Sequence, residues 1–402
     1  IEPTPLVQDI TSPTFPSGDN ISCFEFNDGS IDYVPSGGSP GYVYVWTTGD
    51  GTGLTVDVED QSGLTAGTYT VTVTDLNGCQ ITETITLTEP VILTSSLDPS
   101  IYAGGFNLSG CLPDGSIDLT VVGGSPGYEF SWTPGGQTTE DLSDLPAGDY
   151  EVTVTDINGC ITVSTITLIE PSGLTIDATS PTYASGDNIS CFGLSDGSID
   201  LVVTGGTPGY SYSWTSTDGY VSTTEDPSNI PAGTYTVVVT DDNDCQISTT
   251  ITLIEPIELV QDITSPTYAS GDNISCFGFN DGSIDYTVTG GSPGYTYVWT
   301  TTDGTGLTAG SEDQSGLTFG TYTITVTDLN GCQITETITL TEPTVLVQDI
   351  TSPTYASGDN ISCFGFNDGS IDYTVTGGSP GYTYVWTTTD GTGLTAGSED
   401  QS

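Results

Sequence analysis

The fold is decided by residues 320–340, which read GTYTITVTDLNGCQITETITL. Tyr322, Ile324 and Val326 alternate with threonines, so one face of this segment is apolar and the other is polar. Such alternation is typical of a β-strand with one buried and one solvated face. A second alternating run follows Asn330-Gly331, and an Asn-Gly pair between two such runs predicts a hairpin. The stretch therefore predicts two antiparallel strands.

The neighbouring stretches have the same period of two. Residues 283–289 (SIDYTVT) and 295–299 (YTYVW) alternate in the same way, and a GGSPG turn separates them. Thr, Val, Ile and Tyr all favour strands, and no segment has helical periodicity. We therefore expect an all-β fold, an antiparallel β-sandwich, in each region that repeats this pattern.

A recurring tyrosine narrows the type of sandwich. Four tyrosines stand two residues after a glycine, at the start of the predicted penultimate strand: Tyr69, Tyr150, Tyr235 and Tyr322. This placement resembles the tyrosine corner of immunoglobulin-like sandwiches, so we expect seven or so short strands per repeat. We place these tyrosines in the core together with Trp46, Trp132, Trp214, Trp299 and Trp386. A carbohydrate-stacking platform is the alternative role of the aromatic stripe, and packing is favoured because the stripe follows the core face.

The chain is a tandem array. The five tryptophans are spaced about 85 residues apart, and a Glu-Pro pair ends each of the first four repeats. We divide the chain into residues 1–90, 91–171, 172–256, 257–343 and 344–402, named repeats 1 to 5. Repeat 5 is incomplete, and residues 346–402 are identical to residues 259–315, so we expect the array to continue. A repeat of this size can form its own small core, which favours separate domains in series over a solenoid.

The charge inventory excludes several classes of function. The 402 residues include 53 Asp and Glu but no Lys, Arg, His or Met, for a net charge of −53. Nucleic-acid binding needs cationic side chains to replace counterions, and an anionic membrane would repel the chain. Catalysis by Ser-His-Asp or by a lysine Schiff base is also excluded. Aromatic residues still make up 9% of the chain, so it has the material for folded cores.

The missing cations lead to a simple prediction. Trypsin cleaves after Lys and Arg, and this sequence has neither. We expect prolonged trypsin treatment to leave the chain whole, even when it is denatured and reduced. A protease that cleaves after Glu, used as the control, should cut the same sample into fragments that are visible by mass spectrometry.

Two cysteines fall in each complete repeat: Cys23 and Cys79, Cys111 and Cys160, Cys191 and Cys245, Cys276 and Cys332. Cys363 stands alone, because the matching position lies beyond residue 402. We expect a disulfide within each repeat, since the strands that carry the two cysteines can lie side by side in an immunoglobulin-like sandwich. Buried free thiols are the alternative, and zinc is disfavoured for want of histidine ligands. Disulfides predict a location outside the cytoplasm.

Aspartates recur in two turns of every complete repeat. One set lies in Asp-Gly-Ser turns and the other lies before the last hairpin: Asp28, Asp114, Asp196 and Asp281, and Asp75, Asp156, Asp241 and Asp328. Carboxylates grouped with backbone carbonyls are what Ca²⁺ binds. Asp is also a default turn residue, and no D-x-D-x-D-G loop is present. The turn role is therefore favoured, and Ca²⁺ is the one candidate cofactor.

Three strings together carry a family resemblance: NISCFGFNDGSID (273–285), GGSPGYTYVW (290–299) and GTYTITVTDLNGC (320–332). They are similar to the SprB repeat, and the resemblance covers essentially the whole chain. Repeat 2 departs from the pattern at Leu112, which replaces Phe, and repeat 3 at Asp244, which replaces the hairpin Gly. The resemblance implies a very large cell-surface protein of gliding Bacteroidota, exported as type IX secretion cargo. It brings no catalytic residues.

We therefore predict a non-enzymatic extracellular segment at the cell surface, a semi-rigid stalk of an adhesin or filament for attachment or gliding motility. Junctions such as residues 340–346 contain no Gly/Ser linker, so neighbouring repeats should be stiffly joined. The expected partners are an external surface, a glycan or other cells and, by the resemblance, gliding and secretion machinery. The alternatives are a subunit of a self-assembling extracellular fibre and a glycan-binding module. Neither nucleic acid nor membrane insertion is expected.

Overall fold

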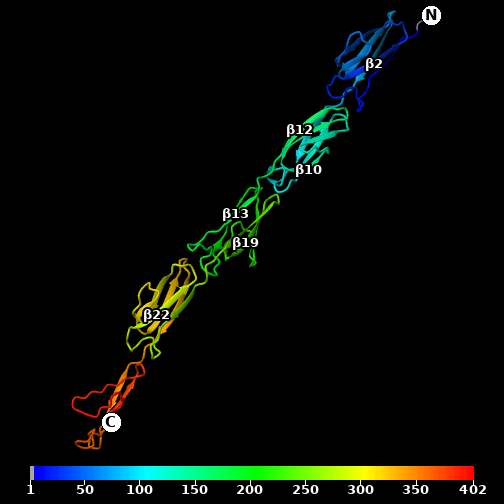
Figure 1. The fold of residues 1–402 in the computed structure, drawn as a ribbon. Coiled ribbons are helices and arrows are strands. Elements are labelled where there is room, and N and C mark those ends of the chain that lie inside the picture. Colours follow the sequence, from blue (N-terminus) through cyan, green and yellow to red (C-terminus); the bar gives the residue numbers. More distant parts are fainter. Residues whose placement is uncertain (1–3) are drawn as a thin grey trace. The chain divides into compact units, whose positions relative to one another are not determined.

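The computed structural model describes residues 4–402 (Figure 1). The described residues form strands and turns without an α-helix, and the one helical turn is a short 3-10 segment, η1 (Ala103–Gly105). Among the described residues, none of the helical segments has the length and apolarity needed to cross a bilayer. The chain divides into two compact units. The first runs to Ile176 and adds Val203–Tyr212 and Val238–Ser248; the second contains Asp177–Val202, Ser213–Val237 and Thr249–Ser402.

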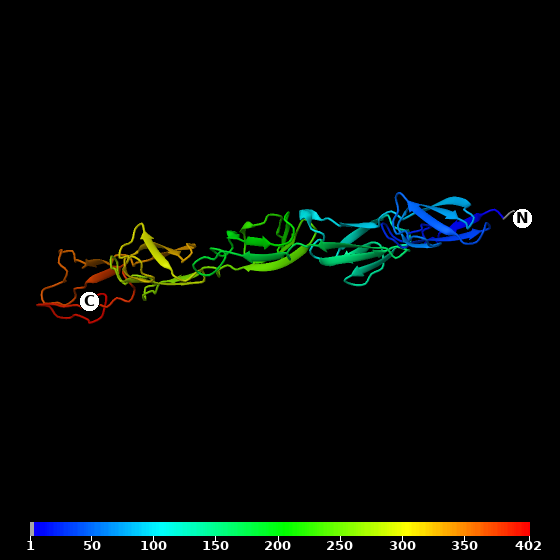
Figure 2. The ribbon, with the colours of Figure 1, turned by 90° about the horizontal axis from the view of Figure 1, so that it is seen from above.

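Repeat 1 illustrates the sandwich (blue in Figure 2). One sheet has the order β1-β2-β4 and the other has the order β3-β5-β6, and all pairings are antiparallel. The strands are β1 (Val7–Thr11), β2 (Gly29–Ser36), β3 (Val43–Thr48), β4 (Gln61–Leu64), β5 (Gly67–Thr74) and β6 (Gln80–Leu87). The array of all-β, immunoglobulin-like antiparallel sandwiches is confirmed. From residue 4 onward this repeat has six strands, one fewer than the immunoglobulin pattern suggested.

The other repeats follow the same plan. Repeat 2 has β7 (Thr94–Pro99), β8 (Gly115–Val122), β9 (Glu129–Thr133), β10 (Leu142–Leu145), β11 (Gly148–Thr155) and β12 (Ile161–Leu168). Repeat 3 has β13 (Thr175–Thr179), β14 (Gly197–Ser198), β15 (Asp200–Thr204), β16 (Ser211–Ser216), β17 (Val221–Ser222), β18 (Ser228–Ile230), β19 (Gly233–Thr240) and β20 (Gln246–Leu253). Repeat 4 has β21 (Val260–Thr264), β22 (Gly282–Thr289), β23 (Thr296–Thr301), β24 (Gln314–Leu317), β25 (Gly320–Thr327) and β26 (Gln333–Leu340). Repeat 5 has β27 (Val347–Thr351) and β28 (Asp372–Thr376).

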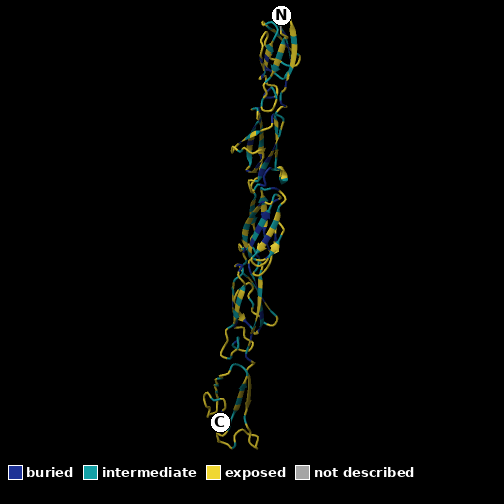
Figure 3. Ribbon diagram, turned by 90° about the vertical axis from the view of Figure 1, so that its right-hand side faces the viewer, coloured by how far each residue is buried: buried dark blue, intermediate teal, exposed yellow. Residues whose placement is uncertain are grey.

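The aromatic residues fill the cores. Buried and exposed residues alternate along the strands, as the period of two predicts (Figure 3). Trp132 and Trp214 are fully enclosed, Trp46 and Trp299 are buried, and Trp386 is half-buried in the incomplete repeat 5. Each indole N–H donates to a backbone carbonyl at 3.0 Å. An enclosed indole offers no ring face to a sugar, so in these repeats the tryptophans act in packing.

The four tyrosines form the corner that the sequence suggested. Each hydroxyl donates to the carbonyl four residues upstream, as from Tyr69 to Thr65 at 2.8 Å and from Tyr322 to Thr318 at 2.8 Å. Tyr150 and Tyr235 make the same bond at 2.9 and 2.8 Å, and all four rings are buried. The bond fixes the connection that leads into β5, β11, β19 and β25, which are the central strands of their sheets.

Two other buried tyrosines make the stability of the fold decrease at high pH. Burial, with smaller contributions from nearby acidic groups, raises the pKa of Tyr33 and of Tyr286 to about 12. Each hydroxyl donates to a glutamine oxygen at 2.6 Å. The unfolded chain ionises these tyrosines near 10, so their contribution to stability is complete below pH 10 and is lost as the pH rises towards 12. Burial also raises the pKa of Tyr44 to about 12. We therefore expect spectrophotometric titration to show at least three tyrosines that ionise late, and Tyr286→Phe to remove one. Titration of every tyrosine near pH 10 in folded protein would contradict this.

Candidate functional site

A loop of one repeat contacts a turn of the next repeat at three junctions. These are the junctions of repeats 1 and 2, of repeats 2 and 3, and of repeats 3 and 4. Each of the three junctions lies within one compact unit. One side is a loop that follows the first strand of a repeat, named here the donor loop: residues 20–28, 107–114, 188–196, 273–281 and 360–368. The other side is the turn before the last strand of the next repeat, named the acceptor turn: residues 75–79, 156–160, 241–245 and 328–332.

A buried aspartate builds each acceptor turn. In repeat 2, Asp156 Oδ1 accepts the backbone N–H groups of Asn158 and Cys160, both at 2.9 Å. Its Oδ2 accepts the N–H of Ser125 at 2.8 Å. Asp75, Asp241 and Asp328 hold their turns through the same bonds. The carboxylate therefore fixes where the asparagine and the cysteine of the turn are presented.

The donor loop is bound to its own sandwich at the end opposite to the acceptor turn of the same repeat. The N–H of Ile21 donates to the carbonyl of Thr88 at 3.0 Å, and the N–H of Thr88 donates to Asn20 Oδ1 at 3.0 Å. Thr88 follows the last residue of β6. Asp28 Oδ1 accepts the N–H of Ser22 at 3.1 Å and shapes the loop from within. Asn20 is thus the anchor of the loop.

The glutamates of three Glu-Pro pairs each accept a backbone N–H group from the donor loop of their own repeat. Glu89 Oε2 accepts the N–H of Glu25 at 2.6 Å. Glu255 and Glu342 accept the N–H groups of Gly193 and Gly278 at 2.6 and 2.7 Å. The sequence marked these glutamates only as the ends of repeats. Their bonds show that the repeat boundary and the donor loop form one structure.

An asparagine of the acceptor turn clamps the two repeats together. Asn158 Nδ2 lies 3.0 Å from the carbonyl oxygen of Ser22 and 3.0 Å from Ser17 Oγ, both in repeat 1. Asn330 makes the same contacts with Ser190 and Ser185, at 3.0 and 2.9 Å. At the second junction, Asn243 Oδ1 accepts the N–H of Ala103 at 3.0 Å. This role was not predicted from the sequence, because asparagine is also an ordinary residue of hairpin turns.

The disulfides lie at these junctions. They join Cys23 to Cys160, Cys111 to Cys245 and Cys191 to Cys332, with Cα–Cα distances of 5.6, 5.6 and 5.7 Å. Each bond links the first cysteine of one repeat to the second cysteine of the next. The prediction of a disulfide within each repeat is therefore wrong for Cys23 with Cys79, Cys111 with Cys160, Cys191 with Cys245 and Cys276 with Cys332.

The reason is the length of the last strand. Cys79 precedes β6, whereas the loop of Cys23 is tied to Thr88 beyond the other end of β6. An eight-residue strand spans about 26 Å, and a disulfide needs its Cα atoms within about 7 Å. The two cysteines of one repeat thus lie at opposite ends of the sandwich. Cys79, Cys276 and Cys363 are free and exposed, and residues 1–402 contain no cysteine at the position that the observed pairing would join to each of them.

The aspartates considered as calcium ligands serve as hydrogen-bond acceptors. Bonds from the backbone N–H groups of Ser39 and Cys79 hold the pKa of Asp75 below its ordinary value. Bonds from Ser275 do the same for the pKa of Asp281. Asp114 and Asp196 accept the N–H groups of Ser109 and Ser190, at 3.0 and 3.1 Å. Within residues 4–402, no three His, Cys, Asp or Glu side chains gather into a group that could hold a metal ion.

This arrangement predicts a small effect of chelators. Because the turn carboxylates are already engaged by N–H groups, the Tm should be the same in EDTA as in millimolar Ca²⁺. The measurement is a thermal melt followed by circular dichroism, with Mg²⁺ as the control cation. An increase of Tm that is specific to Ca²⁺ and grows with its concentration would instead reveal binding to the folded state.

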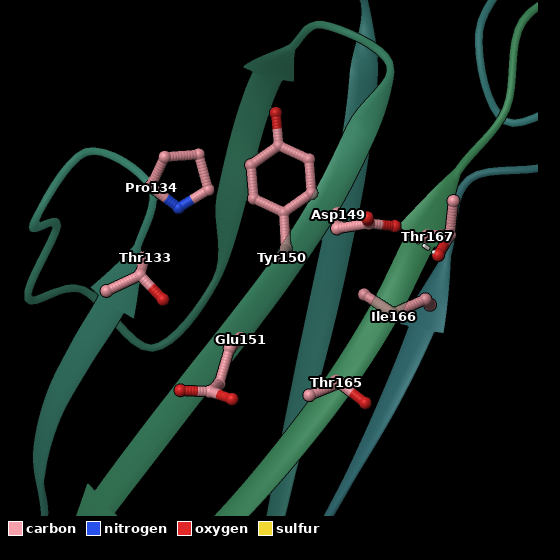
Figure 4. Close-up of a pocket in the computed structure, with 8 residues that line it drawn as sticks. All are labelled: Thr133, Pro134, Asp149, Tyr150, Glu151, Thr165, Ile166 and Thr167. Carbon is pink, nitrogen blue, oxygen red and sulfur yellow. Dashed lines mark hydrogen bonds between the residues drawn. The ribbon is translucent and has the colours of Figure 1, made fainter.

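A hollow of about 500 Å³ lies on the outer face of the sheet β9-β11-β12 in repeat 2 (Figure 4). Asp149 and Glu151 stand two residues apart on β11 and share this face, and Thr167 Oγ1 donates to Asp149 Oδ1 at 2.5 Å. Both carboxylates are exposed. The hollow is a surface groove between strands, and its lining offers no nucleophile activated by a base.

The fold and the junctions define a class: a tandem array of immunoglobulin-like sandwiches, linked from repeat to repeat by disulfides. The SprB repeat family model matches the chain five times, at residues 18–51, 111–137, 185–219, 270–304 and 357–391. The family model therefore identifies an SprB repeat within each of the five repeats of this chain. Four of the matches begin two or three residues before a donor loop, and the match at residue 111 begins inside one, so the family pattern includes all or part of each donor loop. No curated protein sequence matches the chain.

Three solved structures that match this chain do so at low sequence identity and low TM-score. A tetra-tandem repeat from the extending region of a large adhesion protein is 15% identical, with 83% of this chain and 99% of that chain covered and a TM-score of 0.27. The N-terminal eight immunoglobulin domains of Down Syndrome Cell Adhesion Molecule are 11% identical, with 76% and 65% covered and a TM-score of 0.24. Cadherin domains 3–6 of Protocadherin Gamma B2 are 10% identical, with 79% and 95% covered and a TM-score of 0.26.

Proposed function

We propose that this chain is a non-catalytic extracellular segment of a large bacterial surface adhesin or filament, and that it works as a semi-rigid stalk. The observation that carries the proposal is the junction, where a disulfide and an asparagine clamp join each repeat to the next. By its SprB repeats, we assign the stalk to attachment or gliding motility in Bacteroidota, with export by type IX secretion. Disulfides persist in oxidising surroundings, which supports the extracellular location.

Each repeat is proposed to be a separate domain. Three hydrophobic cores, those of repeats 1, 2 and 4, each draw their residues from a single repeat. Repeats that fold as separate domains would otherwise pivot about their linkers, as domains with small interfaces do. The connection at each junction should be stiffer than a flexible linker, because the disulfide and the asparagine hydrogen bonds join the same donor loop to the same acceptor turn. The net charge of −53 further opposes collapse of the array onto itself.

The disulfides also stabilise the folded array. They close loops with sequence separations of 137, 134 and 141 residues. In the chain-entropy model, a loop of this length contributes about 4–5 kcal/mol by restricting the unfolded chain. A stalk that works outside the cell, where no chaperone refolds it, benefits from such a contribution.

Small-angle scattering tests the stalk directly. The sample is the chain with Cys79, Cys276 and Cys363 replaced by serine, so that only the three junction disulfides remain. We expect the pair-distance distribution of a long, thin particle, and a broader distribution after reduction because the junctions loosen. The unreduced and unmutated chain is the control for the serine changes. A compact particle under oxidising conditions would refute the stalk.

A further inference from the structure

The clamp asparagines of the first and third junctions are each followed by a glycine, whereas an aspartate follows the clamp of the second junction. The three pairs are Asn158-Gly159, Asn330-Gly331 and Asn243-Asp244. Both glycines have positive φ angles, of 88° and 93°, and a Cβ atom added to either would meet nothing within 4 Å. A glycine leaves its own backbone nitrogen unshielded by a side chain and its backbone free to rearrange. This nitrogen can therefore approach the amide of the preceding asparagine.

The clamp amides also differ in how firmly they are held. At the second junction both ends of the amide are bonded, since Asn243 Oδ1 accepts the N–H of Ala103 at 3.0 Å and Nδ2 donates to Thr207 Oγ1 at 2.8 Å. Asn158 Oδ1 and Asn330 Oδ1 are buried, and neither accepts a hydrogen bond from residues 4–402. The amides of these two asparagines are thus held through Nδ2 alone, and their carbonyl side is free to turn.

We propose that Asn158 and Asn330 are sites of spontaneous deamidation, with water as the co-reactant, and that the reaction releases the clamp between the repeats. Asn243 is spared, because an aspartate follows it and its amide is bonded at both ends. The inference goes beyond the stalk, because it gives the junctions of one chain different lifetimes.

The reaction needs no group from outside the chain except water. The backbone nitrogen of Gly159 forms a bond to Cγ of Asn158, the Cγ–Nδ2 bond breaks, and ammonia leaves with the proton that the Gly159 nitrogen gives up. Water then opens the resulting succinimide ring at either of its carbonyls, which leaves aspartate or isoaspartate. The new carboxyl group gives its proton to the ammonia. One amide and one water thus become one carboxylate and one ammonium ion, and no electron is transferred.

The folded junction slows this reaction without preventing it. The N–H of Gly159 donates to the carbonyl of Asp156 at 2.9 Å, and Asn158 Nδ2 lies 2.9 Å from Ser125 Oγ. These bonds must break before the ring can close. We therefore expect the folded, oxidised chain to deamidate more slowly than the unfolded, reduced chain.

The product cannot act as a clamp. Asn158 Nδ2 lies 3.0 Å from the carbonyl oxygen of Ser22. In an aspartate, a negatively charged oxygen takes the place of this donor, and two acceptors then face each other without a hydrogen between them. Isoaspartate also lengthens the backbone of the acceptor turn by one carbon. The disulfide of Cys23 with Cys160 then holds the first junction without the amide.

The first test is incubation of the oxidised 402-residue chain in mildly alkaline buffer, followed by Glu-specific digestion and mass spectrometry. The digestion places Asn158, Asn243 and Asn330 in separate peptides. We expect Asn158 and Asn330 to convert at least about tenfold faster than Asn243, the equivalent of the extra hydrogen bond on the amide of Asn243. The unfolded, reduced chain is the positive control. Equal rates at the three sites, or no conversion at Asn158 and Asn330, would overturn the proposal.

A matched variant tests the role of the glycine. Gly159→Asp gives the first junction the sequence of the second, where Asp244 has a φ of 64°. The new side chain has room at this position, so repeat 2 should stay folded. We expect the conversion of Asn158 to slow about tenfold, to the rate of Asn243. Asn330 in the same chain should keep its rate and is the internal control. An unchanged rate at Asn158 would contradict attack by the glycine nitrogen.

A second variant tests the release of the clamp. Asn158→Asp produces one product of the reaction directly, and we expect hydrogen exchange in the donor loop of repeat 1, residues 20–28, to become about tenfold faster. Asn229→Asp is the control, because it adds the same charge at an exposed position of β18. Unchanged exchange in residues 20–28 would show that the clamp survives. Conversion is measured by mass and the stalk by scattering, so a failure of either is distinguishable from a failure of the other.

Discussion

Replacing Asp156 with asparagine is expected to lower the free energy of unfolding of repeat 2 by about 2–4 kcal/mol. Asp156 is buried, and its two oxygens accept three backbone N–H groups. An asparagine has almost the same shape, but its Nδ2 group would face an N–H donor where an oxygen now accepts. One buried N–H therefore loses its partner, and the bonds that remain lose the strength that a charged acceptor gives.

The effect should be local and should reach the junction. Hydrogen exchange followed by mass spectrometry should show faster exchange in residues 156–168 and in the donor loop of repeat 1, because the turn positions both Asn158 and Cys160. Glu151→Gln is the matched control, with the same loss of one negative charge at an exposed position of β11. Equal stability of the two variants would show that the acceptor turn does not depend on its carboxylate.

Replacing Trp132 with alanine is expected to cost about 3–5 kcal/mol, which is the largest effect of any single change considered for this chain. Its side chain is fully enclosed among residues of β8, β10, β11 and β12, and its indole N–H donates to the carbonyl of Thr139 at 3.0 Å. A domain of this size has a total stability of about 4–12 kcal/mol. Repeat 2 should therefore become marginal or unfold.

The neighbouring repeats should survive this change. Repeats 1 and 4 have cores of their own, so their exchange protection should persist while residues 94–168 lose theirs. Trp132→Phe should lose less, because most of the ring volume remains, and Val122→Ala is the surface control because Val122 is 59% exposed. Cooperative loss of protection in repeats 1, 2 and 4 together would contradict separate domains.

Much of the fold could be predicted because it follows from local patterns. Alternation of apolar and threonine residues sets the two faces of β25 and β26, and Asn330-Gly331 sets the turn between them. The position of Tyr322 after Gly320 was enough to suggest a tyrosine corner, and the structure adds the hydroxyl bond to Thr318. The number of strands was less certain, because nothing in the sequence distinguishes a short edge strand from an extended loop.

The pairing of the cysteines could not be predicted from their spacing. Two cysteines per repeat satisfy a pairing within repeats and a pairing between neighbours equally well. The choice depends on the donor loop, which is a strand-free segment whose place is set by the bonds of Asn20 to Thr88 at the far end of β6. The clamp by Asn158 was missed for the same reason, since it requires a neighbouring repeat at that end.

The disulfides also decide what a broken backbone would do to this chain. They enclose the segments 23–160, 111–245 and 191–332, and each of these segments overlaps the next. Every peptide bond between Cys23 and Cys332 therefore lies inside at least one closed ring. Hydrolysis of any single bond in that span leaves the two pieces covalently attached, and tension passes around the cut through a sulfur bridge. In the oxidised chain, no single backbone cleavage between these two residues separates the protein into two molecules.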